Sequence, residues 1–135
     1  MRWLLAIPLS LVVLLLYNAL VWLSHEPAAT LTANAISASL ASGAVFTLTV
    51  GELLLLVGTL ALFTEIVKAT RSSTASVVDH ALSTLVFAVY LVEFLLVKAA
   101  GTGVFLVLAL MSLLDLIAGL TVTIGAARRD LIIDR

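Results

Sequence analysis

Apolar residues gather into four long stretches along the chain, and short polar segments separate them. The stretches cover about residues 3–23, 44–68, 77–97 and 104–126. A helix of about 20 residues is long enough to cross the ~30 Å hydrocarbon core of a bilayer. The pattern therefore predicts an all-α, integral membrane four-helix bundle that forms a single transmembrane domain over residues 1–135.

The first stretch carries a tryptophan near each end. Along a helix Trp3 and Trp22 would lie about 28 Å apart, which places the two indoles in the two interfacial belts of a membrane. Pro8 falls within the second turn, where a kink is tolerated. Arg2 before an apolar run is also typical of signal peptides, but this run is longer than their apolar core of about 7–15 residues. No clear small-x-small cleavage site follows it, so we expect a span.

Residues 24–43 form the longest connection between two apolar stretches. They are rich in Ala, Ser and Thr and contain no Lys or Arg. Leu31, Ile36 and Leu40 either define a weakly amphipathic helix on the membrane surface or are scattered apolar residues of an extended loop. We expect a partly ordered outer loop that packs over the bundle.

The basic residues indicate the orientation. With four spans, six of the seven Lys and Arg residues lie on one side and only Lys98 lies on the other; the six are Arg2, Lys68, Arg71, Arg128, Arg129 and Arg135. Because Lys and Arg are enriched on the cytoplasmic side of membrane proteins, both termini and the tail 127–135 are expected in the cytoplasm.

Composition agrees with a membrane protein and excludes several classes of function. Hydrophobic residues make up 63% of the chain and charged residues 11%, against about half and a quarter in soluble domains. The absence of cysteine excludes disulfides, thiolate metal sites and cysteine nucleophiles. A net charge of -1 offers no basic face for a nucleic acid.

Enzyme and cofactor functions find no support in the motifs. The chain has no nucleophile elbow, phosphate-binding glycine loop or spaced set of metal ligands. His25 and His80 are expected at opposite membrane faces, so they cannot be the two axial ligands of one haem within a monomer. We therefore predict no catalytic residues, no cofactor and no metal.

Asp115 is the most unusual acidic residue, because it lies near the middle of the fourth stretch. At the bilayer midplane an ionised aspartate costs about 2.5–3.5 kcal/mol, so an unpaired Asp115 is expected to be protonated. One interpretation is a proton or cation site, or a counter-charge for a substrate. The other is a neutral side chain that fixes helix packing by a hydrogen bond, either with Ser112 or with a hydroxyl on a neighbour, while Gly119 allows a partner helix to come close.

The third stretch carries a polar stripe. Asp79, Ser83, Tyr90 and Glu93 lie within about 40° of one line when each residue turns the helix by about 100°. Because such a stripe is costly against lipid, it is expected to face other helices or a wet cavity. It is either a path of titratable and hydroxyl groups or a buried face whose acids are bonded to neighbours.

The second stretch has a glutamate near each end, and the two point in different directions about 20 Å apart. Glu65 shares a face with Gly58 and precedes Lys68 by three residues, which predicts an ion pair and a tight helix seam near the inner face. Glu52 lies at the start of its helix, where the helix dipole favours an anion.

Glu52 also lies at a similar depth to Glu93 and Lys98, towards the outer face. An outer cluster of these three side chains, with a cation site, is therefore a hypothesis that the spacing allows.

The runs GELLLLVGTLALFTEIVKATR, VVDHALSTLVFAVYLVEFLLV and LMSLLDLIAG resemble a group of small four-span bacterial inner-membrane proteins of unassigned function. This resemblance implies a bacterial cytoplasmic membrane and no mechanism. Small multidrug-resistance exporters are similar in size and number of helices, but the first stretch of this chain lacks their membrane-embedded glutamate.

We expect a non-enzymatic, small multi-pass protein that is an accessory or scaffolding subunit of a membrane complex. Its partners are then the lipid bilayer and another membrane protein or a second copy of the chain, and no nucleic acid. The alternative is an oligomeric proton- or cation-linked channel or transporter that uses the intramembrane carboxylates.

Overall fold

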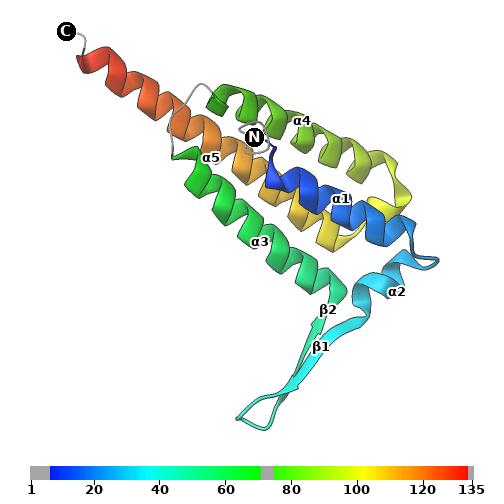
Figure 1. Ribbon diagram of the computed structural model, residues 1–135. Coiled ribbons are helices and arrows are strands. Elements are labelled where there is room, and N and C mark those ends of the chain that lie inside the picture. The colour runs from blue at the N-terminus through cyan, green and yellow to red at the C-terminus, as the bar shows by residue number, and fades with distance from the viewer. Residues whose placement is uncertain (1–6, 71–74, 134–135) are drawn as a thin grey trace.

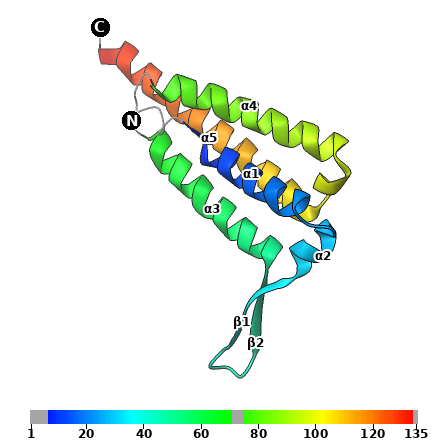
Figure 2. The ribbon, with the colours of Figure 1, turned by 45° about the vertical axis from the view of Figure 1, so that its right-hand side comes forward.

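The computed structural model describes residues 7–70 and 75–133 of the chain. The described residues form four long helices and a two-stranded hairpin. The helices lie side by side, and the hairpin extends from one end of them (Figures 1 and 2). The elements in chain order are α1 (Leu9–Trp22), α2 (Pro27–Thr32), β1 (Asn34–Ser39), β2 (Val45–Thr49), α3 (Val50–Ala69), α4 (Ala75–Leu96), the short 3₁₀ helix η2 (Lys98–Ala100) and α5 (Gly103–Ile133).

Three of the helices are long and apolar enough to cross a membrane. Their spanning segments are Val50–Ala69, Val78–Leu96 and Gly103–Val122. In the described part of the chain α1 is shorter, with 14 residues, and it begins directly after Pro8 instead of containing it. The predicted anchor Trp3 lies outside the described residues, so a fourth span remains a prediction.

The hairpin corrects the prediction of an all-α protein. Strands β1 and β2 pair antiparallel, from Ser39 opposite Val45 to Asn34 opposite Thr49, with one irregularity between Asn34 and Ile36. Gly43 has a φ of 84°, a conformation that a glycine adopts without steric cost, and its N–H donates to the Leu40 carbonyl in the turn. The second apolar stretch was predicted to be helical from residue 44, and this was wrong because its first residues, VFTLT, are β-branched and aromatic types that favour a strand.

The expectation that residues 24–43 pack over the bundle holds for only one part of them. Leu31 on α2 is buried in the core beside the four helices. All residues of β1 are exposed, including Ile36, and Leu40 in the turn is exposed as well. The hairpin therefore stands away from the bundle instead of covering it.

Helix α3 begins at Val50 because a capping box stops the strand there. The Thr49 hydroxyl accepts a hydrogen bond from the Glu52 N–H at 3.2 Å, and the Glu52 carboxylate accepts one from the Thr49 N–H at 2.8 Å. These bonds satisfy two backbone N–H groups that the first helical turn leaves without partners. Strand β2 thus continues into α3 with no linker.

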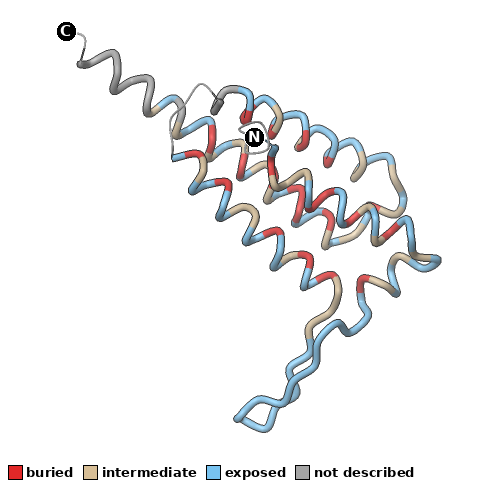
Figure 3. The backbone as a smooth tube through the Cα atoms, in the orientation of Figure 1, coloured by how far each residue is buried: buried red, intermediate tan, exposed pale blue. Residues whose placement is uncertain are grey.

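The apolar core lies where all four long helices meet, and Figure 3 shows buried positions recurring along these helices, whereas the hairpin strands have none. The Phe105 ring on α5 packs between two tyrosines, with ring centroids 4.7 Å from Tyr17 and 5.2 Å from Tyr90. Tyr17 also donates from its hydroxyl to the Ala99 carbonyl at 3.0 Å. This aromatic group joins α1, α4 and α5 near the end of the bundle that carries the hairpin.

Helix α3 packs closely on α5 through glycine. A Cβ atom at Gly58 would lie 2.7 Å from the Leu108 side chain and 3.1 Å from the Met111 sulfur. The glycine thus lets the two helices approach closely, which agrees with the tight helix seam predicted for the face that carries Gly58. Helix α5 runs on to Ile133, so most of the predicted tail 127–135 is helical.

Candidate functional site

Buried polar side chains gather at the end of the bundle away from the hairpin, where α3 ends and α4 begins. They come from α3, α4 and α5, and each is at most 7% exposed: Glu65, Asp79, His80, Ser83, Ser112 and Asp115. We call Glu65, Asp79 and Asp115, together with Lys68, the carboxylate cluster. Buried charges are costly unless they are paired and hydrogen-bonded, so the partners of each group decide what the cluster can do.

Lys68 bridges two of the carboxylates. Its Nζ lies 2.6 Å from Glu65 Oε2 and 3.0 Å from Asp79 Oδ1. The first contact is the ion pair predicted within α3, and the second, which joins α3 to α4, has no signal in the spacing of the sequence. One ammonium group therefore compensates two carboxylates and ties two helices together.

Glu65 also holds the start of α1. Its Oε1 accepts a hydrogen bond of 2.7 Å from the Leu9 N–H. This N–H is in the first turn of α1, where backbone N–H groups lack helical partners and a negative charge is favourable. The Glu65 side chain thus uses both oxygens and links α1 with α3.

Asp115 faces α4 instead of bonding along its own helix. Its Oδ2 accepts a hydrogen bond of 3.2 Å from the Ser83 hydroxyl. Of the two kinds of partner that the sequence allows, Asp115 thus uses a hydroxyl on a neighbouring helix and not Ser112, whose Oγ has no hydrogen-bond partner among the described residues. Within the cluster Asp115 thus joins α5 to α4, while the Lys68 ammonium is bonded to the two other carboxylates.

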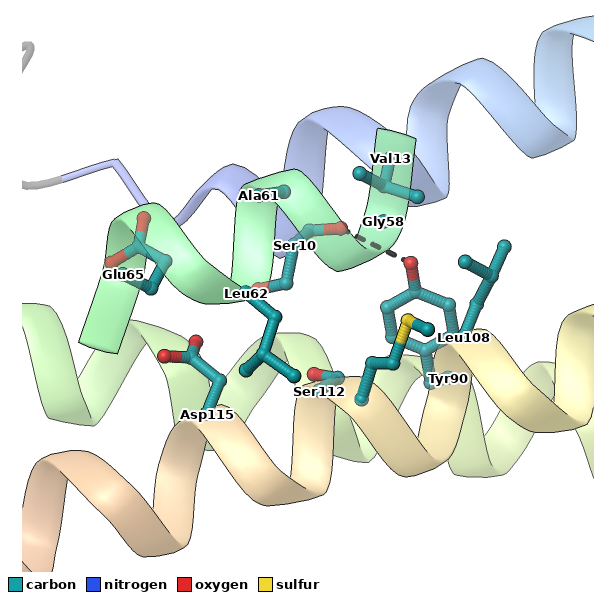
Figure 4. Close-up of a pocket in the computed structure, with 11 residues that line it drawn as sticks. Ser10, Val13, Gly58, Ala61, Leu62, Glu65, Tyr90, Leu108, Ser112 and Asp115 are labelled. Carbon is teal, nitrogen blue, oxygen red and sulfur yellow. Dashed lines mark hydrogen bonds between the residues drawn. The ribbon is translucent and has the colours of Figure 1, made fainter. Parts of the chain in front are cut away.

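A small cavity lies between these groups and the apolar core (Figure 4). Oxygen-bearing side chains of Ser10, Glu65, Tyr90, Ser112 and Asp115 line it. Apolar neighbours complete the wall: Val13, Gly58, Ala61, Leu62, Leu108 and Met111. The space inside measures about 10 Å³, which is room for about one water molecule.

The polar stripe of α4 faces the bundle, and its members bond across to other helices. Asp79 bonds to Lys68 on α3, and Ser83 bonds to Asp115 on α5. Two further members bond to α1. Tyr90 donates to the Ser10 carbonyl at 3.1 Å, and Glu93 accepts from the Asn18 side chain at 2.8 Å. The members thus join helices instead of forming a file of hydrogen bonds along α4, which favours the interpretation of a buried face with bonded acids.

The outer cluster of acids that the spacing allows is not brought together. Glu52 is exposed and bonded to Thr49 in the capping box, whereas Glu93 is bonded to Asn18. Along most of the bundle α1 and α5 lie between α3 and α4, which keeps these two acids apart (Figures 1 and 2). Lys98 is exposed in η2.

His80 fills a space that Gly119 leaves open. A Cβ atom at Gly119 would overlap the His80 ring. The glycine that the sequence assigns to a close helix approach therefore admits a buried imidazole. Within residues 7–70 and 75–133, no group of three or more His, Cys, Asp or Glu residues is arranged to hold a metal ion.

Sequence reasoning missed the residues of α1 that contact this site and the stripe. Ser10 lines the cavity, and Asn18 bonds to Glu93. Both stand out as polar residues within an apolar run, and this is the signal that could have revealed them.

Comparison of the chain with known protein families, with functionally characterised proteins and with solved structures finds no match.

We expect Lys68→Met to lower the stability of the protein by about 1–3 kcal/mol. The substitution leaves the buried Glu65 and Asp79 without a cation. Removing one partner of a buried ion pair destabilises a protein more than removing one partner of an exposed pair. Thermal unfolding in detergent, followed by circular dichroism, measures the change. Lys98→Met, at an exposed position, is the control and should leave the midpoint unchanged; equal midpoints for both variants would contradict the role assigned to Lys68.

Proposed function

We propose that this chain is a non-enzymatic, multi-pass membrane protein that acts as an accessory or scaffolding subunit of a membrane complex. It has four spans and both termini in the cytoplasm, and the resemblance to small bacterial inner-membrane proteins favours the bacterial cytoplasmic membrane. The observation that carries the proposal is the β-hairpin, which offers a surface for a partner outside the lipid.

The hairpin is held firmly at its base. The Val50 N–H donates to the Ala33 carbonyl at 3.0 Å, across the point where the chain enters and leaves the hairpin. On one side Leu31 anchors α2 in the core, and on the other side Thr49 caps α3. A partner bound to the strands would therefore be fixed relative to the helices, as scaffolding requires.

The surface of the hairpin suits a protein partner. Residues 27–51 contain no charged side chain, and Val45 and Phe46 are exposed at 70% and 44%. In a sheet of two strands each strand has an outer edge of unpaired N–H and C=O groups. Uncharged edges accept a further strand readily, so the partner is a membrane protein that presents one, or a second copy of the chain.

The bonding of the acids supports a structural role for most of them. Glu65, Asp79 and Glu93 are each bonded to a helix other than their own, and Glu52 caps α3. Groups occupied in this way stabilise the bundle and are not poised for proton transfer.

Asp115 and its cavity favour a second candidate, an oligomeric proton- or cation-linked channel or transporter. Asp115 is buried and lies outside the ion pairs of Lys68, and the cavity beside it is lined by hydroxyl groups. A carboxylate at this depth beside a polar space is the typical arrangement of an ion pathway.

Native mass spectrometry of the protein, extracted gently from its own membrane, tests the subunit proposal. We expect a defined complex for the wild type, and at least a ten-fold loss of that complex for Val45→Lys because a charge on the strand opposes pairing. Ser42→Lys adds the same charge in the exposed turn and serves as the control. A wild-type monomer, or a complex that survives Val45→Lys, would reject the proposal.

The chain has no cysteine, so single cysteines can report the proposed topology directly. In intact cells a membrane-impermeant maleimide should label Ser42→Cys in the hairpin and should label Asp134→Cys only after the cells are opened. Labelling of both positions in intact cells, or of neither, would contradict four spans with both termini inside.

Flux measurements in proteoliposomes test the second candidate. A proton- or cation-linked transporter should show a pH- or cation-dependent flux that Asp115→Asn abolishes, because the amide cannot carry the charge. Glu93→Gln, in the same stripe but away from the cavity, should retain the flux. If Asp115→Asn folds and conducts like the wild type, the carboxylate is not part of a pathway.

A further inference from the structure

Two hydroxyl groups in the cavity lack hydrogen-bond partners. The Oγ atoms of Ser10 and Ser112 are buried and have no partner among the described residues, and Ser112 is 1% exposed. Both residues line the cavity beside Asp115. A buried polar group without a partner is costly, and two such groups facing one space indicate something that bonds to both.

The dimensions of the cavity limit what it can hold. About 10 Å³ is room for a single water molecule or a single ion of that size. Hydrated ions and organic ligands are too large. The polar groups of the wall are oxygen atoms of hydroxyl and carboxyl groups, which are the ligands that hard cations prefer.

Charge favours a cation over a water molecule. The carboxylate cluster has three carboxyl groups and one ammonium group, and Lys68 is bonded to Glu65 and Asp79. In the described part of the chain Asp115 accepts one side-chain hydrogen bond, from Ser83. A water molecule would satisfy the two serines but would leave an ionised Asp115 without a cation, so this alternative requires the carboxyl group to be protonated.

We propose that this cavity binds one dehydrated monovalent cation of the size of Na⁺. The Asp115 carboxylate and the hydroxyls of Ser10 and Ser112 are its ligands. One carboxylate matches one positive charge, whereas Ca²⁺ takes 6–8 oxygen ligands and Mg²⁺ demands near-ideal octahedral geometry. Tyr90 is a positioning residue, because its hydroxyl donates to the Ser10 carbonyl and fixes the first turn of α1 beside the cavity.

The proposal concerns binding at equilibrium. It holds whether the ion crosses the membrane or stays in the bundle as a structural ion that joins α1 to α5. It is also independent of assembly through the hairpin, so its test uses neither flux nor complex formation.

Equilibrium binding of ²²Na⁺ to the purified protein in detergent, with choline chloride keeping the ionic strength constant, is the first measurement. We expect saturable binding of one ion per chain. Asp115→Asn and Ser112→Ala should weaken this binding at least ten-fold, whereas Glu52→Gln, an acidic residue in the capping box at the other end of α3, should leave it unchanged. Circular dichroism establishes that each variant is folded.

Thermal unfolding separates loss of the ion from loss of the fold. A bound ion stabilises the folded state as its concentration rises, so Na⁺ should raise the unfolding midpoint of the wild type more than choline does. Without Na⁺, Ser112→Ala should be at least as stable as the wild type, since it removes a hydroxyl that has no partner. With Na⁺, the same variant should gain less stability than the wild type gains.

Three results would overturn the proposal. The first is a folded wild type that binds no ²²Na⁺, and the second is equal binding by a folded Asp115→Asn variant. The third is a loss of stability in Ser112→Ala of equal size with and without Na⁺, because the serines would then hold a water molecule.

Discussion

The ion pairs of Lys68 with Glu65 and Asp79 are the contacts on which the arrangement of the helices depends. Lipid tails are as apolar as leucine, so apolar side chains alone give helices in a membrane little reason to choose one register. Charges are different, because in a medium of low dielectric constant each must find its partner. The end of α3, the start of α4 and, through the Leu9 N–H, the start of α1 are joined in this way.

The sequence predicts the features that lie within one helix better than those that join two. Spacing of three residues predicts the pair of Glu65 and Lys68, and the repeat of the helix predicts the inward stripe of α4. The sequence allows a neighbouring hydroxyl as the partner of Asp115 but does not single out Ser83, because Ser83 lies 32 residues away and only packing brings it close. The hairpin was missed because a short apolar run such as VFTLT fits a helix or a strand, although the Thr-x-x-Glu pattern at Thr49 marks the helix start.

The two ends of the bundle are built from different interactions. Near the hairpin the rings of Tyr17, Phe105 and Tyr90 fill the space between helices, and hydrogen bonds lie at their rim. At the other end the carboxylates and Lys68 join the helices by ion pairs and hydrogen bonds. The cavity lies between these charged side chains and the aromatic rings. Tyr90 belongs to both, since its ring packs on Phe105 while its hydroxyl holds the Ser10 carbonyl beside the cavity.

Thr49 is at once the last paired residue of the hairpin and the cap of α3. With no linker between strand and helix, the direction in which the hairpin leaves the bundle follows from the direction of α3. Glu65 and Lys68 lie near the other end of the same helix, where the ion pair with Asp79 orients α3 against α4. The ion pairs at one end of the bundle therefore help to set the direction of the hairpin at the other end.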